Sequence, residues 1–308
     1  MTELSVIVPV FNEAESIVPL YTEIEKYCPK NFELIWVDDG STDTTFTQVQ
    51  LIANSDNRVK CVSLSRNFGH QNALRAGLNY ATGKNIITMD GDLQHPPSLI
   101  PLLLDNLSNG YDIVLAQRKK TVAISPLKRF FSASFYKFIN LISDVPIEEN
   151  VSDFRGFNRK VLNAIKEFEE RDLFLRGLFS WVGFKKIIVQ FEAPSRKFGK
   201  SKYSYIQMFR LALKGTTSFS FKPLRISILI GSIVSLFAFS FAVYALFSHF
   251  NGKTVTGWTS IIIAVMLFGG IQLLAIGLLG EYIAGMFTEV KKRPIFLIKE
   301  KINIHNDQ

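Results

Sequence analysis

Two long apolar stretches near the carboxyl end constrain the fold of this chain most. Residues 226–248 and 258–287 are almost continuously apolar, and no charged residue occurs in 226–247 or 258–280. A helix of about 20 apolar residues crosses the hydrocarbon core of a membrane, which is about 30 Å thick. The sequence therefore predicts two transmembrane helices. The alternative, a pair of buried core helices, is disfavoured by the complete absence of charge.

The charges around these stretches predict their orientation. Lys222 and Arg225 precede the first stretch and residues 291–293 are all basic, whereas the connecting loop 249–257 contains one cation, Lys253. Because cytoplasmic loops carry an excess of Lys and Arg, we expect both termini and the soluble domain in the cytoplasm, at the plasma (inner) membrane. The net charge of +8 would also suit nucleic acid, but with two spans an anionic membrane surface or a phosphorylated substrate is favoured.

The first 220 residues have the pattern of a soluble α/β domain. Apolar runs at 4–10, 32–37, 59–65, 85–89 and 111–116 alternate with amphipathic segments at 14–27, 42–53, 71–81 and 97–107. This alternation predicts βαβ units in a Rossmann-like, mainly parallel sheet with helices on both faces. We expect three parts: a cytoplasmic domain at 1–220, a two-helix transmembrane domain at 221–290 and a cytoplasmic basic tail at 291–308.

Polar residues follow each predicted strand. They are found in Pro9–Glu13, Asp38–Ser41, Arg66–Gly69 and Asp90–Asp92, and at Arg118. In such sheets ligands bind outside the carboxyl ends of the strands, so these groups should share one rim. Acidic and basic groups together suit a ligand with both hydroxyls and phosphates. The chain lacks Gly-x-Gly-x-x-Gly after the first run and lacks Gly-Lys-Ser/Thr, which disfavours dinucleotide-binding and P-loop proteins.

Asp90 and Asp92 stand directly after the apolar run 85–89. Side chains two residues apart on an extended segment point the same way, so both carboxylates can reach one cation. Mg²⁺ or Mn²⁺ is expected, because both prefer oxygen ligands and are commonly held by one or two carboxylates together with substrate phosphates. The alternative is a simple turn in which aspartate bonds its own backbone. The other polar groups at the rim favour the metal.

Five blocks of sequence together resemble glycosyltransferase family 2. They are Val8–Glu13, Val37–Asp43, Ser65–Gly69, Asp90–Pro96 and Ser152–Arg155. The chain is most similar to the polyprenyl-phosphate branch, which contains the bactoprenol glucosyltransferases and dolichyl-phosphate mannosyltransferases, and the similarity continues into Gly280–Tyr282. The resemblance implies a Rossmann-like GT-A nucleotide-sugar domain followed by two transmembrane helices.

The resemblance also implies a role for individual residues. The positions that match the base and ribose site are Pro9, Phe11, Glu13 and Asp39. Those that match the metal and diphosphate site are Asp90, Asp92 and Gln94. Basic positions expected around the diphosphate and the acceptor phosphate are Arg118, Arg129, Arg196 and Lys202. Asp153 and Arg155 match the block that faces the acceptor, and the expected catalytic residues are Asp92, Asp153 and Arg155.

The reaction implied is transfer of one sugar, with inversion, from a nucleotide sugar to polyprenyl (undecaprenyl) phosphate, for modification of a cell-envelope glycan. The second pKa of a phosphate monoester is about 6, so the acceptor is already anionic at neutral pH. A strong general base is therefore dispensable, and Asp153 is expected to orient the acceptor or act as a weak base. UDP-glucose is the favoured donor, with UDP-N-acetylglucosamine and GDP-mannose as alternatives.

Two further segments are expected at the membrane surface. Residues 125–143 and 203–215 combine aromatic or aliphatic side chains with Lys and Arg, the composition of helices that lie in the membrane interface. The alternative for both is an ordinary helix packed on the sheet. Expected partners are the membrane, a flippase, a downstream glycosyltransferase and a second copy of the chain, and no nucleic acid.

Two other functions are less well supported by the sequence. A processive polysaccharide synthase would resemble the same family, but it would carry Gln-x-x-Arg-Trp and more spans, and the segment 207–211 lacks the tryptophan. A catalytically inactive membrane scaffold is the third hypothesis. The intact set of acidic and basic residues at the rim argues against it.

Overall fold

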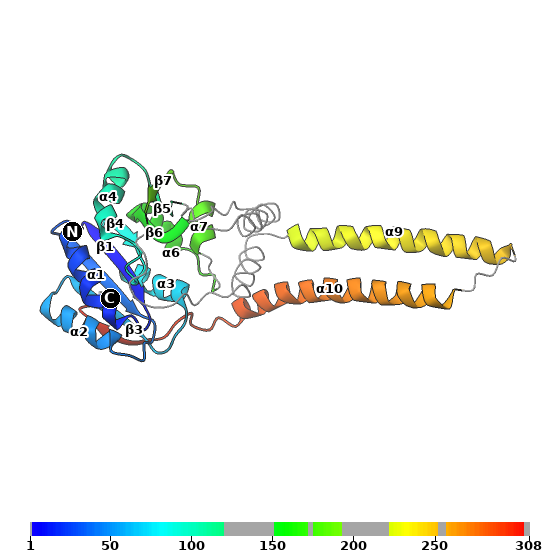
Figure 1. Ribbon diagram of the computed structural model, residues 1–308, viewed down its shortest axis with the longest axis horizontal. Helices are drawn as coiled ribbons and strands as arrows, with labels where there is room; N and C mark the ends of the chain where they lie inside the picture. Colours follow the sequence, from blue (N-terminus) through cyan, green and yellow to red (C-terminus); the bar gives the residue numbers. More distant parts are fainter. Residues whose placement is uncertain (1, 120–150, 172–174, 193–221, 252–256, 305–308) are drawn as a thin grey trace. The chain divides into compact units, whose positions relative to one another are not determined.

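The computed structural model describes residues 2–119, 151–171, 175–192, 222–251 and 257–304. They form two compact units. One is an α/β unit that includes residues 293–304 from the end of the chain, and the other is helical and contains residues 222–292. Figure 1 shows the elements of both units. The predicted interfacial segments 125–143 and 203–215 lie outside the described residues.

The α/β unit is built on an eight-stranded sheet in the order β7-β5-β6-β4-β1-β2-β3-β8. The strands are β1 Leu4–Val10, β2 Phe32–Asp38, β3 Val59–Leu64, β4 Asn85–Thr88, β5 Ile113–Arg118, β6 Val151–Asn158, β7 Lys186–Phe191 and β8 Ile298–Ile302. Strands β1 to β4 pair in parallel, as do β5 and β7. Two strands run antiparallel to their neighbours, β6 between β4 and β5 and β8 beside β3. The predicted mainly parallel α/β sheet is confirmed.

Helices cover both faces of the sheet (Figure 1). Those on one face are α1 Ala14–Tyr27, α2 Thr45–Ser55, the short 3₁₀ helix η1 Pro97–Leu99 and α4 Ile100–Ser108. Those on the other are α3 His70–Tyr80, α6 Arg159–Lys166 and α7 Leu175–Trp181. Strand β1 shows the reason, because Val6 and Val8 enter one core while Ile7 enters the other. Successive side chains of a strand alternate between its faces, so a strand apolar throughout needs cover on both sides.

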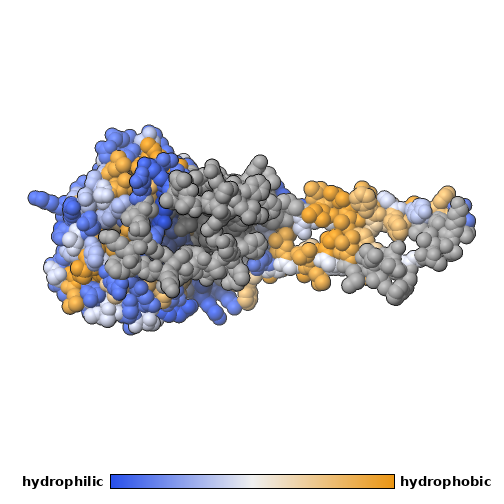
Figure 2. Space-filling model, viewed as in Figure 1, coloured by the Kyte–Doolittle hydropathy of each residue, from blue (hydrophilic) through white to orange (hydrophobic). Residues whose placement is uncertain are grey.

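The helical unit contains α9 Lys222–Phe250 and α10 Trp258–Val290, which lie side by side. By length and composition, Leu267–Val290 can cross a membrane, whereas the apolar part of α9, Ser227–Phe241, is shorter. Large apolar side chains are exposed on both helices, including Phe237 at 72% and Leu274 at 77% (Figure 2). Patches of this kind mark a surface that is covered by protein or membrane. One apolar helix therefore indicates association with a membrane.

A buried carboxylate joins neighbouring strands near their amino ends. Glu33 of β2 accepts hydrogen bonds from Ser5 Oγ at 2.5 Å and from Lys60 Nζ and Thr82 N, both at 2.6 Å. Burial would raise the pKa of Glu33, but the hydrogen bonds from these partners outweigh it and hold the pKa below its ordinary value. Ionised Glu33 therefore stabilises the end of the sheet away from the rim.

We expect Glu33→Ala to lower the free energy of unfolding by about 3 kcal/mol, because it leaves buried donors without an acceptor. A group with a depressed pKa stabilises the fold above its unfolded pKa, and this contribution is lost as pH falls through the folded pKa. The difference between wild type and variant should therefore shrink below about pH 4.3. Urea titrations at pH 7 and pH 3.5 measure it, with exposed Glu23→Ala as the control; an undiminished difference at pH 3.5 would contradict the assignment.

Candidate active site

The loops after β1 and β2 are joined at the carboxyl rim of the sheet. Asn12 donates its backbone N–H to Ser41 Oγ at 3.0 Å, and its side-chain oxygen accepts from Thr42 N at 2.8 Å. The backbone N–H of Asp39 donates to Val10 O at 2.9 Å. Asn12 adopts a φ of 54°, a left-handed conformation that asparagine tolerates better than most residues. These contacts fix both loops over the ends of their strands.

Asp39 connects these loops to the loop after β3. Its two carboxylate oxygens accept from the backbone N–H groups of Phe68, at 2.7 Å, and Gly69, at 2.9 Å. Burial raises the pKa of Asp39, and the two amides oppose that shift. The next residue, Gly40, has a φ of 72°, and a Cβ there would lie 2.4 Å from the carbonyl carbon of Arg66. Only glycine allows the two loops to approach this closely.

The loop after β4 presents Asp92 and Gln94 at the rim, both half-buried. Gly91 packs on β1 so closely that a Cβ would lie 2.6 Å from Val10 Cγ1. Leu93 has a φ of 62°, a rare conformation for a leucine, and Gln94 N donates to Asp92 Oδ1 at 3.1 Å. Backbone strain of this kind is concentrated at functional sites. Asp92 and Gln94, two of the predicted metal and diphosphate residues, therefore share one tight turn, in which the aspartate bonds the backbone of its own loop.

Strand β6 brings Asp153 beside Asp90. The antiparallel register pairs Thr88 with Arg155, and its continuation places Asp153 opposite Asp90. Thr88 Oγ1 donates to the backbone oxygen of Asp153 at 2.6 Å. Arg155 is 1% exposed, donates from Nη2 to Asp153 Oδ1 at 2.8 Å and stacks its guanidinium 4.6 Å from the ring centre of Phe179. Arg155 is thus a buried support for the Asp153 carboxylate.

The structure adds a residue that the sequence analysis did not predict, His70. It is the first residue of α3, and its Nε2 lies 3.4 Å from Asp90 Oδ1 and 3.4 Å from Asp153 Oδ2. Ligand atoms of these three residues lie within 4.8 Å of one another, close enough to share one cation. The sequence offered one indication of this role: His70 directly follows the loop 65–69, which was predicted to lie at the rim.

His95 lies beneath Asp90 and is fully buried. Its Nδ1 accepts the backbone N–H of Asp90 at 2.9 Å, which in a neutral ring leaves the proton on Nε2, 3.6 Å from Asp90 Oδ2. Burial lowers the pKa of His95, with Asp90 acting in the opposite direction, and the ring stacks on Phe154 at 5.1 Å. Arg118 Nη2 lies 3.5 Å from the same Nε2, a contact between two donors in this tautomer and therefore not a hydrogen bond. His95 therefore sets the position of Asp90 and contacts Arg118.

Two buried atoms at this rim test whether the site suits a metal and a phosphate. Asp90 Oδ1 and Arg118 Nε have no hydrogen-bond partner among the described residues, although His70 Nε2 lies 3.4 Å from the former. Such atoms are costly to bury without a partner. A carboxylate oxygen suits a divalent cation and a guanidinium N–H suits a phosphate oxygen. The residues present fit both groups.

The remaining predicted residues fall into two sets. Pro9 is buried at the end of β1, while Phe11 and Glu13 are half-buried just beyond it, so all three lie at the same rim as Asp39. Arg129, Arg196 and Lys202 lie outside the described residues.

Comparison with known proteins gives a consistent result. The sequence profile of the family described as "Glycosyl transferase family 2" matches residues 5–166. The "Prophage bactoprenol glucosyl transferase homolog" of Escherichia coli (strain K12) is 42% identical over 96% of this chain and 98% of its own. The "Bactoprenol glucosyl transferase" of Shigella phage SfX is 40% identical over 97% and 99%. The "Uncharacterized glycosyltransferase sll0501" of Synechocystis is 39% identical over 97% and 95%.

A solved structure supports the fold. Residues 1–349 of TarS from S. aureus, crystallised with UDP-GlcNAc, align with a TM-score of 0.50 and 20% identity. The alignment covers 70% of this chain and 66% of TarS 1–349. At this identity the likeness concerns the fold, a GT-A-like α/β sheet.

We expect Asp90→Asn and His70→Ala each to weaken Mn²⁺ binding at least about tenfold, because each removes a ligand or neighbour of the cation. The measurement is electron paramagnetic resonance of free Mn²⁺ in a titration of purified protein without substrate. Asp105→Asn, an exposed carboxylate on α4, is the control and should bind as wild type does. Unchanged binding by His70→Ala would exclude His70 from the metal site.

Proposed function

We propose, from the premise that the chain belongs to glycosyltransferase family 2, that it transfers one glucose from UDP-glucose to a polyprenyl phosphate at a membrane. This proposal rests mainly on one observation: Asp90, Asp153 and His70 lie close together at the carboxyl rim of the sheet. Arg118 lies at the same rim. Relatives named for glucosyl transfer to bactoprenol, similar over nearly the whole chain, support the sugar and the lipid.

The donor nucleotide is proposed to lie over the ends of β1 and β2. Pro9, Phe11 and Glu13 would contact the base and ribose, with the ring of Phe11 offering an apolar face. Asp39 would shape the nucleotide site by holding the loop after β3, because its two carboxylate oxygens accept hydrogen bonds from backbone amides of that loop. The uridine site is therefore preorganised by contacts between three loops.

The diphosphate is proposed to lie over the loop after β4. Asp90, Asp92 and Gln94 would hold Mg²⁺ or Mn²⁺, with His70 and Asp153 beside Asp90. The metal, when bound, supplies positive charge that stabilises the leaving diphosphate. Arg118 would donate from its buried Nε to a phosphate oxygen. Fixed donors at a developing negative charge lower the barrier because they need no reorganisation.

The acceptor is proposed to approach from the side of Asp153. An oxygen of the lipid phosphate attacks the anomeric carbon while the bond from that carbon to the UDP oxygen breaks, and the configuration inverts. The phosphate is already anionic, so no proton need be removed. The Asp153 carboxylate orients the acceptor, and Arg155 acts on Asp153 from within the core. Arg155 is thus a positioning residue.

The membrane arrangement extends this proposal. Both α9 and α10 would cross the membrane, with residues 1–220 and the basic residues 291–293 in the cytoplasm. Arg129, Arg196 and Lys202 would bind around the donor diphosphate and the acceptor phosphate, with Arg129 on the interfacial segment 125–143. A glucosylated lipid made on this face must be moved across by a flippase and used by a second glycosyltransferase. Self-association of the chain is part of the same proposal.

The deciding experiment is a transfer assay with purified protein, Mg²⁺ or Mn²⁺, undecaprenyl phosphate and radiolabelled UDP-glucose. We expect release of UDP and one labelled product that partitions into organic solvent. Asp92→Asn should lower kcat by about 100-fold or more, because charge stabilisation of the leaving group is lost. Asp105→Asn should not. Transfer only from UDP-N-acetylglucosamine or GDP-mannose would correct the sugar, whereas a water-soluble polymer would favour a processive synthase.

The role of Asp153 is open to a separate test. We expect Asp153→Asn to lower kcat by about 10- to 100-fold while the dependence of kcat on pH keeps its shape, because the acceptor needs no deprotonation. The measurement is single-turnover transfer between about pH 7.5 and pH 9, well above the second pKa of the acceptor phosphate. A variant whose rate rises with pH over this range, where the wild type is flat, would instead assign Asp153 as a general base.

A further inference from the structure

The last segment of the described chain closes one edge of the catalytic sheet. We name residues 293–304, which follow α10, the return segment. Its strand β8 runs antiparallel to β3, with Val62 opposite Lys301. Ile298 and Ile302 pack against the cores on opposite faces of the sheet. In its absence β3 would present an open edge of backbone N–H and C=O groups.

One end of the return segment reaches the rim. The backbone N–H of Ser65 donates to Leu297 O at 2.8 Å. Ser65 begins the loop 65–69, whose amides at Phe68 and Gly69 are held by Asp39 on the opposite side. His70 follows this loop directly and faces Asp90 and Asp153. The loop is therefore held between the donor site and the return segment.

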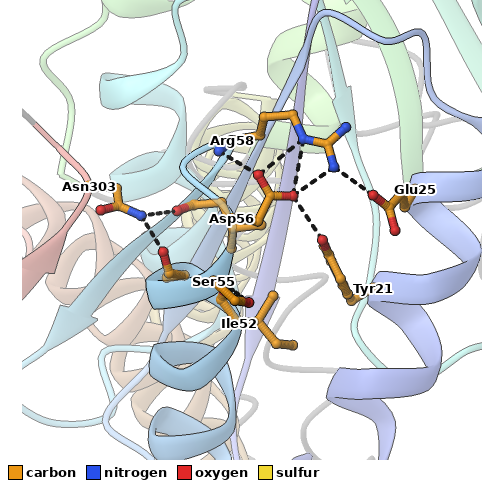
Figure 3. Close-up of polar contacts among 9 residues, drawn as sticks. Tyr21, Glu25, Ile52, Ser55, Asp56, Arg58 and Asn303 are labelled. Carbon is orange, nitrogen blue, oxygen red and sulfur yellow. Dashed lines mark hydrogen bonds and ion pairs between the residues drawn. The ribbon is translucent and has the colours of Figure 1, made fainter.

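The other end is fixed by Asn303. Its Nδ2 donates to Ala53 O at 2.6 Å and to Val59 O at 2.9 Å, joining the end of α2 to the start of β3. Asn303 has a φ of 56°, so the chain turns there in a left-handed conformation. Figure 3 shows Asn303 near a cluster in which Asp56 accepts from Tyr21 and Arg58. One side chain therefore anchors the end of the return segment remote from the rim.

We propose that the return segment is a positioning element for the donor site: by pairing with β3 between Leu297 and Asn303, it sets the loop 65–69 and, through it, Asp39 and His70. This inference deepens the proposed function and rests on it for the identity of the donor. Seven residues, 291–297, separate the end of α10 from β8. The donor site thus depends on chain that is synthesised only after the apolar helices.

Asn303→Ala in the full-length protein tests the proposal, because it releases the anchor without touching the rim. We expect the KM for UDP-glucose to rise about 3- to 10-fold with a smaller change in kcat. We also expect faster amide hydrogen exchange at Phe68 and Gly69, a measurement that needs no substrate. Tyr21→Phe is the matched control, since it removes one hydrogen bond of the neighbouring cluster and leaves the return segment intact. It should change neither quantity.

A disulfide provides the rescue. Ile302 stands opposite Cys61 in the antiparallel register, and directly opposed side chains point to the same face with Cβ atoms about 5 Å apart. In Asn303→Ala/Ile302→Cys, oxidation should link the return segment to β3 and restore the donor KM and slow exchange; reduction should reverse both.

The outcomes separate this inference from the proposed function. Equal donor KM and equal exchange in Asn303→Ala and wild type would overturn the positioning role while leaving glucosyl transfer intact. Equal effects of Tyr21→Phe and Asn303→Ala would reduce the role to general stability and also overturn it. If wild type transferred no glucose, the proposed function would fail, and the exchange measurement would still decide whether the return segment positions the loop.

Discussion

The site depends above all on one carboxylate, Asp39, whose two oxygens accept the backbone N–H groups of Phe68 and Gly69. A buried carboxylate is stable only when it is compensated, and here the compensation comes from a loop that belongs to another strand. The same contact places Gly40 against the backbone of Arg66. It also fixes the start of α3, where His70 is the first residue. Loops after three parallel strands are thus fixed relative to one another before any ligand binds.

The chemistry is then assembled across the sheet. Parallel strands bring the loops after β1, β2, β3 and β4 to one rim. Asp153, the second acidic residue of the cluster, comes instead from the antiparallel strand β6. Its register sets Asp153 opposite Asp90, and His70 approaches both from α3. Arg155 pairs with the Asp153 carboxylate within the core, and Arg118 lies at the rim beside His95. This arrangement suits an incoming cation and phosphates together.

The local parts of the fold were predictable from sequence. The strand at 4–10 and the helix at 14–27 agree with the structure residue for residue, because strong apolar periodicity and the turn residues between them act over short distances. The same reasoning found Asp90, Asp92 and Arg118 at the ends of strands. It did not find β6, β7 or β8, whose partners are far away in the sequence, and it did not find His70, whose role arises only from proximity to Asp90 and Asp153.

The sequence by itself determined the α/β class, the apolar carboxyl-terminal helices and the family, because these depend on periodicity, composition and short blocks of residues. Only the tertiary structure decided that Arg155 is buried under Asp153, that Asp39 holds a neighbouring loop and that residues 298–302 complete the sheet beside β3. The physical reason is that backbone pairing and burial of charge join groups that are remote along the chain. Local pattern carries no information about which remote partner each group will meet.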